Sequence, residues 1–172
     1  PTLEQFIGGV LGRMKSHSYF SKILVNVERT HEPVVLLLHK PQVETPNWDA
    51  AMVATHGPWL KKLEEVFRAT YVEPLGWKRL TDTPAYPVCV LQTHGDYVNF
   101  SKSIQEHSYN WSSACYDRKL RTTVVFQEAL TGVVPHQKRY YELAEFVRAL
   151  LAAHYHGTDG KLAQAWLAEG LG

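Results

Sequence analysis

The stretch "YPVCVLQTHGDYVNFSKSI", residues 86–104, joins an apolar strand to a capped helix, and this junction sets the fold class. The run from Tyr86 to Gln92 is rich in apolar and β-branched residues, which predicts a strand. Thr93 follows at an N-cap position, and residues 93–104 are predicted to continue as a helix. Helix and strand therefore meet within one short segment, which is typical of a domain that contains both.

The segments upstream repeat this mixture. Two apolar runs, "KILVNVE" at residues 22–28 and "PVVLLLHKP" at residues 33–41, predict strands joined by a turn. Between Trp48 and Tyr71 apolar residues recur at helical spacing, which predicts a long helix that Pro58 kinks or breaks. The same spacing predicts a short amphipathic helix over residues 2–15, with its apolar face at Leu3, Phe6, Ile7, Val10 and Leu11.

The downstream half adds a hairpin and two helices. "SSACYDRKLRTTVVFQEAL", residues 112–130, predicts two strands around a polar turn at residues 117–120. "HQKRYYELAEFVRALLAAHYHG", residues 136–157, has one continuous apolar face and predicts a helix that ends at Gly157. "LAQAWLAEGLG" begins another helix at residue 162. The order of elements predicts an α+β fold with a mixed sheet.

Composition excludes several classes of partner. The 172 residues contain 18 Lys and Arg against 17 Asp and Glu, so the net charge of +1 does not indicate nucleic-acid binding. No apolar run reaches the roughly 20 residues that cross a bilayer, so we expect no membrane insertion. One domain over residues 1–172 is expected, as a whole protein or as part of a longer one. Oligomeric state and localisation, in the bacterial cytoplasm or the cell envelope, stay open.

The two cysteines are too few for a disulfide scaffold. Cys89 and Cys115 each lie on a predicted strand, and they lack the paired spacing of a zinc knuckle. Two alternatives follow, namely two buried free thiols or a single bridge in an oxidising compartment.

The C-terminal residues Trp166, Glu169 and Gly170 form a W-x-x-E-G element. This element resembles the one that supplies the glutamate ligand in gluzincin metallopeptidases and in related bacterial families of unknown function. The preceding strands are similar to those that lead into the active-site helix of these proteins. The resemblance implies a zincin-like fold, with a former active-site helix at residues 137–155 and the start of a glutamate helix.

The zinc motif of this family is degenerate here. Active gluzincins carry H-E-x-x-H on one helix, which gives two imidazoles to zinc and a glutamate that activates water. At the spacing typical of the family, Val147 and Leu151 stand at the two histidine positions, and Arg148 stands at the glutamate position. Apolar side chains cannot bind zinc, and a protonated guanidinium cannot act as a general base. The resemblance therefore implies a pseudoenzyme, with no catalytic residues and no cofactor.

Three functions remain open. The first is a non-catalytic, peptidase-like domain that binds a peptide or protein partner, with an exposed strand edge holding an extended chain. The second is a residual zinc metallopeptidase that uses Glu169 with His154 or His156. The third is a structural or interaction domain of a larger protein. A groove beside an open strand edge would favour the first, and a cleft plugged by Val147, Arg148 and Leu151 would favour the third.

Overall fold

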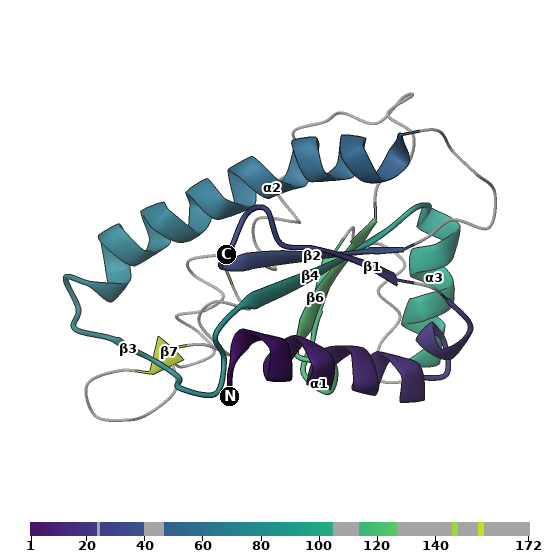
Figure 1. Ribbon diagram of the computed structural model, residues 1–172, viewed down its shortest axis with the longest axis horizontal. Helices are drawn as coiled ribbons and strands as arrows, with labels where there is room; N and C mark the ends of the chain where they lie inside the picture. Colours follow the sequence, from purple (N-terminus) through teal and green to yellow (C-terminus); the bar gives the residue numbers. More distant parts are fainter. Residues whose placement is uncertain (24, 40–46, 105–113, 127–145, 148–154, 157–172) are drawn as a thin grey trace.

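Helices cover both faces of a five-stranded mixed sheet in this chain (Figure 1). The computed structural model describes residues 1–23, 25–39, 47–104, 114–126, 146–147 and 155–156. Its helices and strands are α1 (Leu3–Ser16), β1 (Val25–Glu28), β2 (Val34–His39), α2 (Trp48–Phe67), β3 (Lys78–Arg79), β4 (Tyr86–Leu91), α3 (His94–Ser103), β5 (Ala114–Asp117), β6 (Thr122–Phe126) and β7 (Tyr155–His156). A short 3₁₀ turn (Phe20–Lys22) follows α1, and a π-helical turn (Arg68–Val72) follows α2.

The sheet has a parallel centre and antiparallel edges. Its strand order is β1-β2-β4-β6-β5, with β2, β4 and β6 parallel. The edge strands β1 and β5 run antiparallel to their neighbours. All residues of the three central strands are buried, because helices lie on both faces of a parallel sheet. The short strands β3 and β7 form a separate antiparallel pair.

Alternate side chains of the sheet supply two cores, one on each face. Helix α2 packs on one face, where its Leu60 and Phe67 join Leu36 and Val88 of the sheet. Helices α1 and α3 pack on the other face (Figure 1). Among the residues that the structure describes, no helix is long and apolar enough to cross a membrane.

Most of the predicted elements are confirmed. The helix at the N-terminus, the β1–β2 and β5–β6 hairpins and strand β4 form where their patterns indicate. Thr93 caps α3 through its side-chain oxygen, which accepts a hydrogen bond from the Asp96 amide at 3.1 Å. The mixed α+β class is therefore confirmed, and the zincin-like part of the expectation stays a prediction.

Helix α2 continues through Pro58 without a break. A proline inside a helix removes the hydrogen bond to the carbonyl four residues earlier, which here belongs to Ala54. Both Pro58 and Ala54 are exposed, so water can bind this carbonyl. Pro58 therefore destabilises the helix less at this exposed position than it would in the core.

The prediction of a helix up to Gly157 is wrong at its end. Tyr155 and His156 form strand β7, in which His156 pairs with Lys78 and Tyr155 pairs with Arg79. Main-chain pairing with β3, which is distant in the sequence, overrides the local helical pattern there. Phe146 and Val147 are helical, and the rest of residues 137–154 lies outside the described residues.

The alternative of two free thiols is confirmed. Cys89 and Cys115 are both buried and unbridged. Each of them pairs with Val124 on the intervening strand β6, so they are two strand spacings apart, or roughly 9.5 Å. A disulfide needs Cα atoms within about 7 Å. Burial raises the pKa of the Cys89 thiol, which keeps it protonated and inert.

Candidate functional site

The two edges of the sheet differ in how far they are covered. At β5, three of the four residues are buried. At β1, Asn26 and Val27 are exposed, and Val27 keeps 37% of its accessible surface. No strand of the described residues pairs with the outer side of β1. An edge of this kind presents unpaired N–H and C=O groups that can pair with another chain.

A groove of about 470 Å³ lies between β1 and the first half of α2. We call it the β1 groove. Along the helix the lining consists of small apolar residues and one carboxylate, and along the strand it is mostly polar. The lining residues are Asn26, Val27, Glu28, Leu38, Asp49, Ala50, Val53 and Ala54.

The charge of the β1 groove is negative. Of the described residues that line it, Glu28 and Asp49 are ionisable and none is Lys or Arg. The side chain and main chain of Thr30 donate hydrogen bonds to Glu28, and these bonds lower the pKa of its carboxyl group. The Asp49 carboxylate accepts a hydrogen bond from the Asn26 amide group at 2.6 Å, which links the helix to the strand. Both carboxylates are therefore fixed in place beside the open edge.

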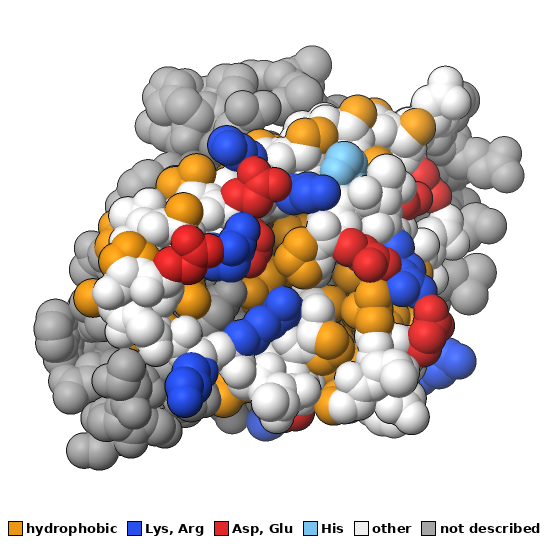
Figure 2. Space-filling view, turned by 60° about the vertical axis from the view of Figure 1, so that its left-hand side comes forward, with side chains coloured by type: hydrophobic (Ala, Val, Ile, Leu, Met, Phe, Trp, Pro, Cys, Tyr) orange, Lys and Arg blue, Asp and Glu red, His pale blue; other side chains and the backbone are white. Residues whose placement is uncertain are grey.

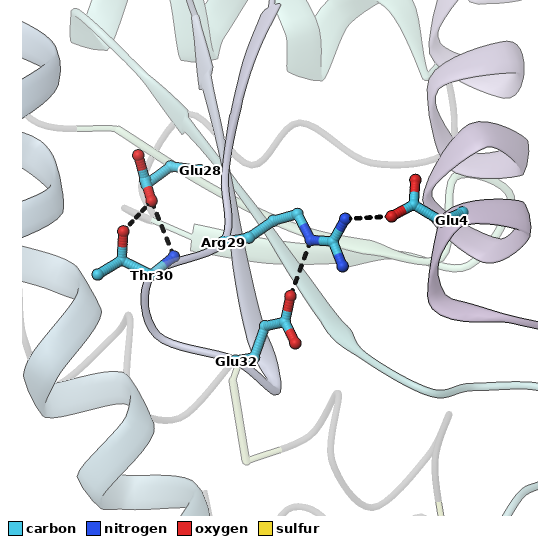
Figure 3. Close-up of polar contacts among 5 residues, drawn as sticks. All are labelled: Glu4, Glu28, Arg29, Thr30 and Glu32. Carbon is cyan, nitrogen blue, oxygen red and sulfur yellow. Dashed lines mark hydrogen bonds and ion pairs between the residues drawn. The ribbon is translucent and has the colours of Figure 1, made fainter.

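The cation that follows β1 points away from this groove. Figure 3 shows Glu28 on the α2 side of the hairpin and Arg29 on the α1 side. The Arg29 guanidinium contacts Glu4 of α1 at 2.5 Å and Glu32 at 2.8 Å. These two carboxylates neutralise Arg29, so it does not offset the negative charge of the groove.

Two polar side chains, His39 and Asp96, lie near each other at the carboxyl ends of β2 and β4. The Nδ1 atom of His39 lies 3.9 Å from the Asp96 carboxylate, too far for a hydrogen bond. Burial lowers the pKa of His39, so this histidine is held neutral. The carboxylate accepts hydrogen bonds from the main chain and hydroxyl of Thr93, at 3.1 and 2.7 Å. The arrangement is that of a helix cap, and we assign no chemistry to it.

Only two of the predicted site residues fall within the described part of the chain. Val147 is helical and 6% exposed, and it packs in the core beneath α2. His156 lies in β7. The structure does not describe the remaining positions, which are Arg148, Leu151, His154 and Glu169. Within the described ranges, no group of three or more His, Cys, Asp or Glu side chains is placed to hold a metal ion.

Comparisons with protein-family models, with curated proteins and with solved structures found no match to this chain. The resemblance to gluzincins therefore rests on the sequence pattern, and it stays a prediction.

Sequence reasoning had not singled out the residues of the β1 groove. One signal was present in "KILVNVE", where polar Asn26 and Glu28 alternate with valines and so mark a strand with one face toward solvent. A second signal was the pair of alanines at positions 50 and 54, which lie on one helix face and leave space beside it. Neither signal shows that these two surfaces face each other, because residues far apart in the sequence bring them together.

Proposed function

We propose that this domain is a non-catalytic module that binds an extended, basic peptide segment of a partner protein along the edge of β1. The observation that carries the proposal is the β1 groove, which adjoins an edge strand that no described strand covers. Its fixed carboxylates, and the lack of cations among the described residues that line it, favour Lys or Arg side chains in the partner.

Binding would proceed by strand addition. The main chain of the peptide pairs with β1, which contributes affinity with little dependence on sequence. Alternate side chains of an added strand face the same side, so every second residue would lie over the groove. There, small apolar side chains would contact Val53, and cationic side chains would approach Asp49.

Two further points support a function without catalysis. The gluzincin resemblance implies a fold that holds peptides as extended strands, and here it would be retained without its zinc motif. Val147, at a predicted ligand position, is apolar and packed in the core. That burial favours the third expectation as well, namely that side chains fill the former cleft. The two roles are compatible, because peptide binding at β1 does not use that cleft.

The proposal can be tested with synthetic peptides of about eight residues, the length of a typical strand. The first has Val and Lys in turn at alternate positions with Thr between them, so that both kinds of side chain face the groove, and it is amidated at its C-terminus. The second carries Glu in place of Lys, and the third is the basic peptide with an N-methyl group on every residue, which removes the main-chain donors from both edges. Fluorescence anisotropy measures binding to the full chain. We expect the basic peptide to bind and the other two to bind at least about tenfold more weakly.

Variants locate the binding site. Asp49→Asn keeps an acceptor for Asn26 and removes one charge, and we expect it to weaken binding of the basic peptide about threefold. Glu65→Gln removes a charge from the same helix outside the groove and serves as the control. Equal binding of the basic and N-methylated peptides would rule out strand addition. Equal effects of the two variants would rule out the β1 groove.

A further inference from the structure

A second hollow, of about 490 Å³, lies beside the last two turns of α2. We call it the Glu64 pocket. In Figure 2, acidic and basic side chains surround a hollow with hydrophobic side chains on its floor. The lining residues of the pocket are Pro33, Lys61, Glu64, Glu65, Arg68, Val72, Trp77 and Arg79.

A close contact between α2 and the β1–β2 turn separates this pocket from the β1 groove. Gly57 lies between the residues of α2 that line the two hollows. The ring of His31 packs against Gly57 so closely that a Cβ atom there would come within 1.9 Å of the histidine Cδ2. The two hollows are therefore distinct sites, and a ligand of one does not have to occupy the other.

Arg79 lines the pocket and, within the described ranges, carries a donor without a partner. Its Nε atom donates to the Thr83 carbonyl at 3.0 Å, and its guanidinium lies 4.5 Å above the centre of the Tyr86 ring. These contacts hold the guanidinium in one orientation. Its Nη2 atom is buried and has no hydrogen-bond partner among the described residues. A buried N–H group without an acceptor is costly, so this atom favours a ligand oxygen.

The remaining charges of the pocket set the charge of the ligand. The cations Lys61, Arg68 and Arg79 line it together with the carboxyl groups of Glu64 and Glu65. Glu73, outside the lining, offsets the charge of Arg68, so a ligand meets the charges of Lys61 and Arg79 beside the two carboxyl groups. Lys61 forms no ion pair within the described residues, whereas Arg68 contacts Glu73 at 2.5 Å and Glu64 at 4.0 Å. Among the described residues, Lys61 has no ion-pair partner and Arg79 has a donor without an acceptor, so these two cations are available to a ligand.

The carboxyl group of Glu64 disfavours a ligand of higher charge. Its side chain is 5% exposed, and burial raises its pKa although Arg68 and Arg79 lower it. A dianion such as a phosphate ester would bring a second negative charge beside this buried carboxyl group. Apolar surface from Pro33, Val72 and Trp77 completes the lining and suits an organic body in place of a bare ion.

We propose that the Glu64 pocket binds a small organic carboxylate. The carboxylate accepts hydrogen bonds from Arg79 and Lys61, and the apolar part of the ligand lies against Val72 and Trp77. This site is independent of peptide binding at β1.

Titration calorimetry with benzoate as the probe tests this site on the full chain. We expect benzoate to bind with a dissociation constant of about 1 mM or tighter, and benzamide, its neutral counterpart, not to bind detectably. Arg79→Gln should weaken benzoate binding at least about tenfold, and Lys61→Gln about threefold. Lys62→Gln is the matched control, because Lys62 adjoins Lys61 in the sequence but does not line the pocket; its exposed ion pair with Glu65 at 3.4 Å is weak, so its loss should change binding less than the loss of Lys61.

Several results would overturn the inference. Absence of benzoate binding, or equal loss in the Lys61 and Lys62 variants, would show that the pocket is not the site. Phenyl phosphate binding more tightly than benzoate would contradict the preference for a monoanion. If Arg79→Gln does not fold, the comparison of Lys61→Gln with Lys62→Gln still shows whether benzoate binds in the Glu64 pocket. NMR shifts of the Trp77 indole N–H on adding benzoate locate the ligand, and the amidated peptide should leave them unchanged.

Discussion

The β1 groove and the Glu64 pocket lie along the same stripe of α2 and differ in what they offer a ligand. The stripe contains positions 50, 54, 57, 61, 64 and 68, which recur at helical spacing and so share one face. Before Gly57 the stripe consists of alanines, and after it of Lys61, Glu64 and Arg68. The first half of the helix thus lines the proposed peptide site, and its second half lines the proposed carboxylate site.

This difference shows how side-chain size on one helix decides the kind of recognition. Small residues leave room for a whole peptide beside an open strand edge, where main-chain groups supply most of the contacts. Long charged residues fill more of the space, and the volume that remains suits a small ligand bound by side-chain donors. The contact of His31 with Gly57 keeps the two environments apart.

The largest effect is expected from a change that removes the common support of both sites. Leu60 is fully buried between α2 and the sheet, so Leu60→Ala should lower the free energy of unfolding by about 2–5 kcal/mol. Binding of the basic peptide and of benzoate should decline together. Val66→Ala, on the exposed side of the same helix, should change stability by no more than about 0.5 kcal/mol. Urea unfolding measures both, and similar losses would refute the assigned packing of α2.

A bulky side chain in the β1 groove should weaken peptide binding without affecting benzoate binding. Ala54 is exposed and lines the groove, so Ala54→Trp should fill it and weaken peptide binding by about tenfold or more. Benzoate binding should not change, because His31 and Gly57 lie between the hollows. Ala51→Trp, on an exposed position of α2 that lines neither hollow, is the control. Loss of both activities in Ala54→Trp would show that the hollows form one site.

Two glycine substitutions measure the contact that divides the sites. Replacing a helix-interior glycine with alanine stabilises a helix by up to about 1 kcal/mol. Gly12→Ala in α1 should show this gain, because no atom lies within 4 Å of the added Cβ. Gly57→Ala should show less stability than this control or an outright loss, since the ring of His31 must move. Equal gains in thermal unfolding experiments would mean that the histidine ring yields without cost.

The smallest effect is a loss of stability with rising pH, which the Glu64 pocket should show, whereas the lowered pKa of Glu28 in the β1 groove acts in the opposite direction. Burial raises the pKa of Glu64 above its ordinary value of 4.5, so the folded protein binds this proton more tightly than the unfolded chain does. The contribution of the group to stability is therefore fully present below pH 4.5 and is lost as pH rises through the raised pKa. Glu64→Gln should gain stability relative to the original protein over that window.

Urea unfolding at a series of pH values checks the prediction for Glu64. Glu65→Gln, the same exchange on the neighbouring half-buried side chain, controls for the change in net charge. A constant difference between Glu64→Gln and the original protein at every pH would contradict the assigned effect of burial.

Much of the fold could be predicted because its signals are local. The apolar runs of β2 and β4, the cap at Thr93 and the turn of the β5–β6 hairpin are each encoded within a few residues. The prediction failed where a strand distant in the sequence determines the local structure. Tyr155 and His156 have a helical pattern but form a strand, because they pair with β3.

The candidate sites could be predicted far less well. The sequence directed attention to the C-terminal pattern, of which the structure describes only Val147 and His156. The residues of the β1 groove and the Glu64 pocket belong to no motif, and each is an ordinary surface or core residue in its own segment. They become sites because α2 packs against the β1–β2 hairpin, and this packing depends on contacts between residues that are distant in the sequence.

Most helices and strands follow from local patterns, since hydrophobic period, caps and turn residues act over a few positions. The near-neutral charge and the small side chains of Ala50 and Ala54 are likewise evident in the sequence. The strand order, the open side of β1 and the contact at Gly57 arise only in the folded chain. These features depend on which apolar faces meet in the two cores, and burial of those faces stabilises the whole arrangement at once.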